Sequence, residues 1–279
     1  MKLFHVSDVH FGAEDPAAIA WFKERVAEER PDGVIMSGDL TMRALPTEFD
    51  AGGKWLQSLG VPVTIEPGNH DIPYYWDPIR RLFSPYKRYG AAERLIEKPL
   101  DLAGVSIVPL KTTARAQWRW NWSKGRVSNG SLKRTLALLQ DVPRGNLVFV
   151  VGHHPLIEGG TKGTARTRNG DIALARLAEA GVHAVLSGHV HDPFDIPYRT
   201  AAGRLRMIGA GTRRLLVLGV LPLGVGEDAR RDRGPEATRR HGNALHLLAR
   251  DGRDGTGEQG ARCGDLCRGV EQASRDPCD

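Results

Sequence analysis

Residues 3–10 read Leu-Phe-His-Val-Ser-Asp-Val-His, an apolar run followed directly by a carboxylate and an imidazole. The apolar run is typical of a buried strand. Four later segments close similar runs with a glycine and then Asp, Asn or His: residues 38–39, 68–71, 152–154 and 188–191. In open α/β sheets the carboxyl ends of the strands meet at one rim, where ligands bind. The five segments therefore predict an α/β fold whose polar strand ends converge.

Helical patterns fill the intervals between these strand-like runs. Apolar residues recur at helical spacing in residues 16–30, 46–59, 129–140 and 171–180. Ser128 is placed to cap the third of these helices, and Gly181 to end the fourth. The alternation predicts an α/β sandwich with strands buried on both faces. His5 and His183 lie within strand runs and are predicted to be core histidines.

The polar strand ends carry the ligand types that divalent metals select. Asp8 and His10 are two positions apart, so at an extended strand end both side chains project to the same side and can bind one ion. The carboxylate of Asp39 has two oxygens and can bridge two ions. The remaining candidates offer an amide oxygen or an imidazole nitrogen: Asn69, His153, His189 and His191. This set predicts a two-metal hydrolytic site, and its mixed oxygen and nitrogen ligation favours Mn, Fe or Zn over Mg.

The order of the five segments resembles the signatures of the calcineurin-like metallophosphoesterases, which read D-x-H, G-D, G-N-H-D, G-H and G-H-x-H. The resemblance covers about residues 1–212, which we interpret as one metallophosphoesterase domain. Within it, residues 68–75 look like the class III cyclic-nucleotide phosphodiesterase branch. The resemblance implies a four-layer αββα sandwich of two mixed sheets flanked by helices.

The resemblance also implies a role for each polar residue. One metal would be held by Asp8, His10, Asp39 and His191, and the second by Asp39, Asn69, His153 and His189. A hydroxide bridging the two ions would attack phosphorus. His70 would contact the phosphoryl oxygen, together with Asn69, or protonate the leaving group, and Asp71 would hold the orientation of His70 or a nearby loop. His154 is expected beside the ligands or in the packing around them, because the family pattern uses the first histidine of this pair.

These roles predict a dinuclear-metal phosphodiesterase that acts on a small substrate such as a 3',5'-cyclic nucleotide. The alternatives are a phosphomonoesterase and a glycerophospho- or sugar-nucleotide diesterase. A non-catalytic scaffold of the same fold is a further alternative, but such a scaffold is expected to lack the ligands that are present here. A nuclease is disfavoured because the basic residues are dispersed and form no separate nucleic-acid module.

One loop carries candidate substrate-binding cations. Arg119 and Lys124 flank tryptophans at alternate positions 118, 120 and 122. One interpretation is a wall that stacks a base and attracts phosphate. The other is an aromatic ladder within a sheet or at a subunit interface.

Charge and hydropathy place few limits on partners. The chain has 39 Lys and Arg against 33 Asp and Glu, a net charge of +6, which fits an anionic substrate but also fits an Arg-rich composition with no partner. No signal-peptide pattern precedes Asp8, and the apolar stretch of residues 215–225 is too short to span a bilayer. A cytoplasmic location is therefore expected, and a homodimer is compatible with the sequence.

Residues 213–279 differ in composition from the rest. All 18 Phe, Trp and Tyr residues lie at or before Tyr198, and only residues 244–250 look capable of forming a helix. Such a composition cannot offset its ordering entropy by burial, so this tail is predicted to be largely disordered. A shift of reading frame near residues 212–216 and a genuine extension both remain open.

Overall fold

The computed structural model describes residues 1–74, 76–97, 100, 102–116, 121, 123–159, 161, 166–201 and 203–211, and the strands 214–222 and 243–251. Its strands form two five-stranded sheets, ordered β10-β9-β1-β2-β3 and β4-β5-β6-β8-β7. The first sheet contains β1 (Lys2–Val6), β2 (Gly33–Met36), β3 (Val63–Ile65), β9 (Arg214–Pro222) and β10 (Asn243–Asp251). The second contains β4 (Val105–Pro109), β5 (Leu147–Val151), β6 (Ala184–Ser187), β7 (Phe194–Thr200) and β8 (Gly203–Gly209).

Both sheets are mixed. In the first sheet β1, β2 and β3 are parallel, and β9 pairs antiparallel with β1 and with β10. In the second sheet β4, β5, β6 and β8 are parallel, and β7 is antiparallel to β8. The parallel core of each sheet aligns the carboxyl ends of its strands, so segments that follow these strands lie at a common edge.

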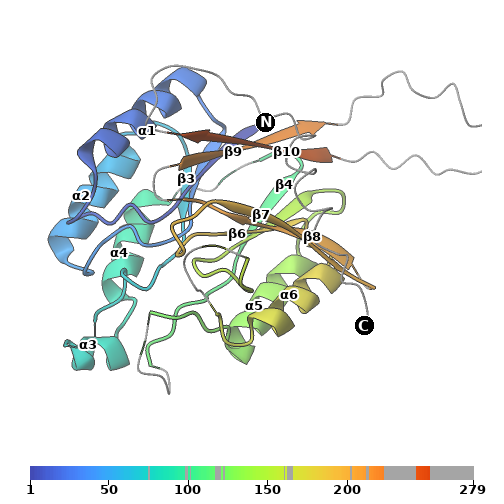
Figure 1. Ribbon diagram of the computed structural model, residues 1–279. Helices are drawn as coiled ribbons and strands as arrows, with labels where there is room; N and C mark the ends of the chain where they lie inside the picture. Colours follow the sequence, from blue (N-terminus) through green and yellow to red (C-terminus); the bar gives the residue numbers. More distant parts are fainter. Residues whose placement is uncertain are drawn as a thin grey trace, which may run out of the picture.

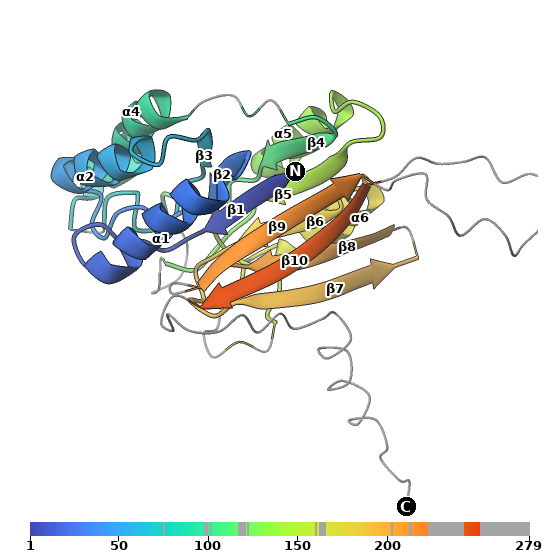
Figure 2. The same cartoon turned by 90° about the horizontal axis from the view of Figure 1, so that it is seen from above.

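Helices cover the outer face of each sheet (Figures 1 and 2). Those over the first sheet are α1 (Pro16–Glu29), α2 (Pro46–Gln57) and α4 (Lys87–Ile96), and those over the second are α5 (Asn129–Gln140) and α6 (Gly170–Glu179). The short helix α3 (Pro78–Phe83) lies away from both sheets (Figure 1). The predicted cap of α5 is confirmed, since the Ser128 hydroxyl accepts the Ser131 N–H at 3.1 Å. Gly181 follows α6 with φ +79°, as expected for a helix stop.

Alternating side chains of the strands supply three apolar layers. Phe4 of β1 packs with helices α1, α2 and α4, whereas its neighbour Leu3 packs into a cluster between the two sheets. In the second sheet Val150 faces α5 and α6, whereas Phe149 faces the cluster between the sheets. Strands buried on both faces require apolar residues at successive positions. The prediction of a four-layer αββα sandwich of two mixed sheets is confirmed.

The helix predicted for the tail is wrong, because residues 244–250 lie in the strand β10. Residues 214–222 form β9, which pairs with β1 and extends the first sheet beyond residue 212. Ala and Leu favour a helix in isolation, but a nine-residue antiparallel register with β9 pairs one edge of β10. The rest of the tail lies outside the described residues. Within the described residues, no helix is both long enough and apolar enough to cross a membrane.

The two histidines that were predicted to lie in the core differ in burial. His5 is fully buried, and its Nε2 lies 2.8 Å from the Ser37 hydroxyl. His183 is exposed, because it precedes β6 instead of lying within it. Its Nδ1 accepts the Val148 N–H at 3.1 Å, and partial burial of the side chain lowers the pKa of His183.

Candidate metal centre

The seven predicted ligands follow the carboxyl ends of five strands from both sheets. Strands β1, β2 and β3 of the first sheet lead to Asp8, His10, Asp39 and Asn69, and strands β5 and β6 of the second lead to His153, His189 and His191. Six of these residues, together with His70 and His154, fall into four overlapping groups whose ligand atoms lie within 4.8 Å of one another: Asp8-His10-His191, His10-Asp39-His70, Asp8-Asp39-His153 and His153-His154-His189. The seventh, Asn69, lies 3.2 Å from His153 Nε2 through its Oδ1. The convergence that the sequence predicted is therefore observed.

The first candidate set surrounds the carboxylate of Asp8. Its Oδ1 lies 3.9 Å from Nε2 of His10 and 3.7 Å from Nε2 of His191. These separations exceed a hydrogen bond, but two ligands each about 2.1 Å from one ion lie no more than about 4.2 Å apart. Among the described residues Asp8 Oδ1 is buried without a hydrogen-bond partner. A buried, unpaired carboxylate oxygen facing two imidazoles fits a cation and is otherwise costly.

The second candidate set is centred on His153. Its Nδ1 donates to the Ser37 carbonyl at 2.9 Å, because a carbonyl oxygen can only accept. This bond directs Nε2 toward Asp39 Oδ2 and Asn69 Oδ1, both at 3.2 Å. Burial opposes protonation, yet the charge of Asp39 outweighs it and raises the pKa of His153 to about 9. A position that holds a proton this strongly in a buried site attracts cations.

A single oxygen of Asp39 lies between the two sets. Asp39 Oδ1 accepts the backbone N–H of His70 at 2.8 Å, so this oxygen is already engaged. Oδ2 lies 3.2 Å from Nε2 of His153 and 3.9 Å from Nε2 of His10. The sequence suggested bridging through both carboxylate oxygens, whereas this geometry leaves Oδ2 alone to face both candidate ion positions.

Burial keeps two of the imidazoles neutral. Desolvation lowers the pKa of His189 to about 3, helped by His153, and it also lowers the pKa of His10. A neutral imidazole presents the lone pair that a metal ion needs. Together with the unpaired oxygen of Asp8, these residues fit the divalent ions implied by the sequence.

Five candidate ligands have a left-handed backbone, whereas the sequence analysis expected an extended backbone for two of them, Asp8 and His10. Their φ values are 58° for Asp8, 54° for His10, 56° for Asp39, 69° for His189 and 60° for His191. The pairs Asp8/His10 and His189/His191 therefore converge through tight turns beyond the strand ends. Non-glycine residues in this region are uncommon and cluster at functional sites.

Two close contacts join the sheets at the centre. The N–H of His189, after β6, donates to Asp8 Oδ2 at 2.9 Å, and Gly188 lies so close to Asp8 and Ser7 that a Cβ would overlap both. Gly38, with φ +105°, brings its Cα close to the ring of His153. Glycine at both positions permits this close approach of backbone and candidate ligands.

His70 is oriented by the backbone and by a tyrosine. Its Nδ1 donates to the Met42 carbonyl at 2.8 Å and also contacts the Tyr74 hydroxyl, which donates to the same carbonyl at 3.2 Å. With Nδ1 fixed in this way, Nε2 is left for a substrate. Neither Met42 nor Tyr74 was singled out from the sequence, because a main-chain acceptor carries no residue signal.

Asp71 holds the loops and not the ring of His70. Its carboxylate accepts three N–H groups, from Leu40 at 3.2 Å, Thr41 at 2.9 Å and Gly68 at 2.9 Å, and the Thr41 hydroxyl at 2.9 Å. Burial, and then the nearby charge of Asp39, raise the pKa of Asp71 to about 6 despite these bonds. Of the two roles expected from the sequence, these contacts match the support of a nearby loop.

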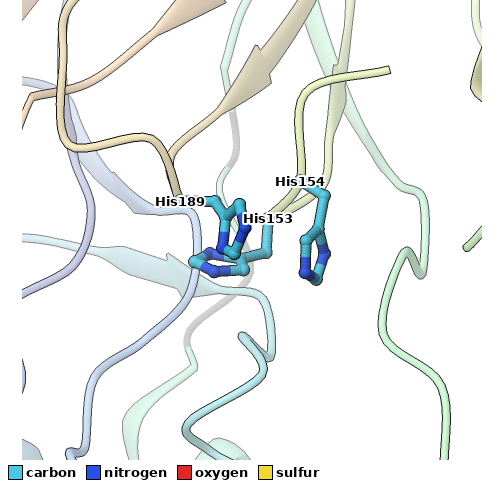
Figure 3. A group of neighbouring side chains, drawn as sticks. All are labelled: His153, His154 and His189. Carbon is cyan, nitrogen blue, oxygen red and sulfur yellow. The ribbon is translucent and has the colours of Figure 1, made fainter. Parts of the chain in front are cut away.

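His154 lies beside the ligands, and both of its ring nitrogens have other partners (Figure 3). Its Nε2 lies 2.7 Å from the Ser123 carbonyl, and its Nδ1 lies 2.9 Å from the Thr112 hydroxyl. Burial holds the pKa of His154 well below its usual range, so the ring is neutral. Nε2 therefore carries the proton and Nδ1 accepts from Thr112, which leaves no lone pair for a metal.

We expect His154→Ala to retain two ions per chain and to lose stability. The substitution removes the side-chain hydrogen bonds to the half-buried Ser123 carbonyl and to the Thr112 hydroxyl, which still accepts the backbone N–H of residue 154, at a cost of about 0.5–1.5 kcal/mol for each lost bond. Metal analysis and urea unfolding measure the two effects. The neighbouring variant His153→Ala should lose bound metal. Loss of an ion from His154→Ala would instead make His154 a ligand.

Of the two predicted substrate-binding cations, Lys124 lies near the centre, where its charge contributes to the low pKa of His189. The hydrogen bond from His154 to Ser123 fixes the residue before Lys124. Arg119 and the tryptophans at positions 118, 120 and 122 lie outside the described residues.

The geometry and the fold together define a class, the metal-dependent phosphoesterases with two-sheet sandwich folds. The sequence profile described as calcineurin-like phosphoesterase matches residues 1–193. The chain belongs to this family.

The similar proteins that share this fold carry names that refer to different activities. The chain is 24% identical over 220 residues to the SbcD component of the nuclease SbcCD from Staphylococcus epidermidis, covering 70% of this chain and 58% of that protein. Among solved structures it resembles a dimetal phosphatase from Danio rerio, with TM-score 0.56 and 13% identity, covering 78% of this chain and 95% of the other. It also resembles a purple acid phosphatase from yellow lupin (Lupinus luteus) seeds, with TM-score 0.60 and 13% identity, covering 92% and 52%. These structural likenesses show the fold.

Proposed function

We propose that the protein is a dinuclear-metal phosphodiesterase acting on small substrates such as 3',5'-cyclic nucleotides. The observation that carries the proposal is the position of Asp39 Oδ2 between imidazoles of two ligand sets, 3.2 Å from His153 Nε2 and 3.9 Å from His10 Nε2. A carboxylate oxygen shared in this way is typical of two-metal sites. The first ion would be held by Asp8, His10, Asp39 and His191, and the second by Asp39, Asn69, His153 and His189.

The chain's own residues would position the phosphoester and supply a proton. Two divalent ions, when bound, neutralise the phosphoryl oxygens and activate the attacking water. His70 faces the same centre and presents Nε2, while Nδ1–H stays bonded to Met42. His70 can give a proton from Nε2 to the leaving oxygen, while the bond from Nδ1–H to the Met42 carbonyl orients the ring. Mn, Fe and Zn suit the mixed ligand set.

The alternative enzyme activities would use different substrates but the same candidate metal centre. A phosphomonoesterase and a glycerophospho- or sugar-nucleotide diesterase would use the same ligands. A nuclease is a second candidate because the relative from Staphylococcus epidermidis is part of a nuclease. A cytoplasmic location and a homodimer remain predictions.

Hydrolysis of bis(p-nitrophenyl) phosphate and p-nitrophenyl phosphate by metal-stripped protein, with and without added Mn²⁺, tests the proposal. We expect metal-dependent turnover that favours the diester, and its loss in Asn69→Ala and His191→Ala. Cyclic nucleotides and linear DNA are then compared as natural substrates. A preference for the monoester would identify a phosphomonoesterase, and cleavage of DNA without turnover of cyclic nucleotides would favour the nuclease. Absence of turnover of all four substrates by folded protein carrying two ions would contradict the proposal.

A further inference from the structure

A row of aromatic rings leads from the candidate metal centre toward the surface. The rings of His191 and His10 stack with centroids 5.4 Å apart, and His10 meets His70 edge to face at 4.8 Å. His70 in turn meets Tyr74 at 5.4 Å. Trp76 stacks on Tyr74 with centroids 4.3 Å apart and planes 11° from parallel.

The outer end of this row is open to solvent. Trp76 is 61% exposed, whereas Tyr74 is half-buried. A single exposed hydrophobic residue is ordinary in a soluble protein. Trp76 differs because its plane is held parallel to a ring that itself contacts the candidate catalytic His70. The five rings therefore form a continuous series of contacts between the candidate metal centre and the exposed ring of Trp76.

The inner ring of this pair is held in place by polar contacts. The Tyr74 hydroxyl donates to the Met42 carbonyl and contacts His70, so these contacts hold the outer end of the Tyr74 side chain in place. Trp76 stacks on the ring of this anchored side chain. A flat group arriving next to Trp76 meets a surface that is already ordered, which lowers the entropy cost of stacking.

We propose that Tyr74 and Trp76 form a subsite that stacks a planar ring of the substrate, so that the preferred phosphoesters carry a nucleobase. The inference rests on the proposed function, which places the phosphate beside His70. The sugar then extends past His70 along the ring row, and the base reaches Trp76. Stacking of this kind accepts any base, because every base has a π face.

The test compares binding of two anions that share a sugar phosphate and differ in the base: adenosine 5'-monophosphate and ribose 5-phosphate. Their dissociation constants are measured calorimetrically with Mn²⁺-loaded wild-type protein and with Trp76→Ala. We expect the wild-type protein to bind the adenosine compound about tenfold more tightly, and Trp76→Ala to remove most of this difference. Ribose 5-phosphate should bind both proteins equally.

Phe83→Ala is the matched control, since Phe83 is 81% exposed in the neighbouring helix α3 and is not one of the rings in the row. It should retain the preference for the adenosine compound. Equal binding of the two anions to wild-type protein, an equal loss for both in Trp76→Ala, or the same loss in Phe83→Ala would each overturn the inference.

This test separates the subsite from the proposed reaction. Binding of the two anions needs no turnover, so the subsite can be confirmed in a protein that proves to be a phosphomonoesterase. Conversely, diester hydrolysis with equal affinity for the two anions would retain the proposed function and overturn the subsite.

Discussion

Asp39→Asn is expected to reduce phosphoester hydrolysis by about a thousandfold or more, on the scale of lost electrostatic stabilisation in other hydrolases. The substitution removes the charge of the one oxygen that faces both candidate ion positions. It also leaves the buried ring of His153 without the anion that raises its pKa. We expect the ion content to fall from two per chain to one or none, measured by elemental analysis beside activity.

The matched control for this change is Asp50→Asn. Asp50 is an exposed carboxylate of α2 that pairs with Lys54 at 2.7 Å. Its loss should leave both ion content and rate unchanged, because exposed ion pairs contribute little. Full activity of Asp39→Asn with two ions bound would exclude a shared carboxylate.

His70→Gln is expected to lower kcat by about a hundredfold to ten thousandfold while two ions remain bound. The loss should be smaller for p-nitrophenyl esters than for cyclic nucleotides, because a good leaving group needs less help from a proton donor. Steady-state kinetics with both substrates and metal analysis of the same preparation measure these effects.

An exposed histidine provides the control for His70. His183→Gln changes a ring at the start of β6 that is exposed to solvent, and it should retain the wild-type rate. If His70→Gln loses metal in proportion to activity, His70 is a ligand and not a proton donor. Equal losses for both kinds of ester would also exclude leaving-group protonation.

The sequence predicted the strands and helices that carry the centre, because apolar periodicity and glycine-flanked polar ends are local signals. It could not show how the ligands of each D-x-H and H-x-H pair converge. Asp8 and His10 do so through left-handed backbone, which is set by contacts such as the bond from Asp8 N to the Gly38 carbonyl.

The contacts around His70 were also beyond the sequence. Asp71 was the natural candidate for orienting its neighbour, but the acceptor is the carbonyl of Met42, 28 residues away. The helix propensity of Ala and Leu also gave a wrong prediction for β10, where it suggested a helix. Pairing with β9 gives this segment its strand conformation. A partner strand that is distant in the sequence cannot be recognised from the seven residues alone.

The bond from His189 N to Asp8 Oδ2 joins residues 181 positions apart. During synthesis, the candidate ligands of the first sheet would therefore leave the ribosome long before those after β6. If the proposed residues hold the ions, no ion could be fully coordinated until about residue 191 had emerged and the two sheets had docked. Contacts so distant in sequence form late in folding. Metal uptake would thus report on the completion of this domain, and a stalled or truncated nascent chain would remain unloaded.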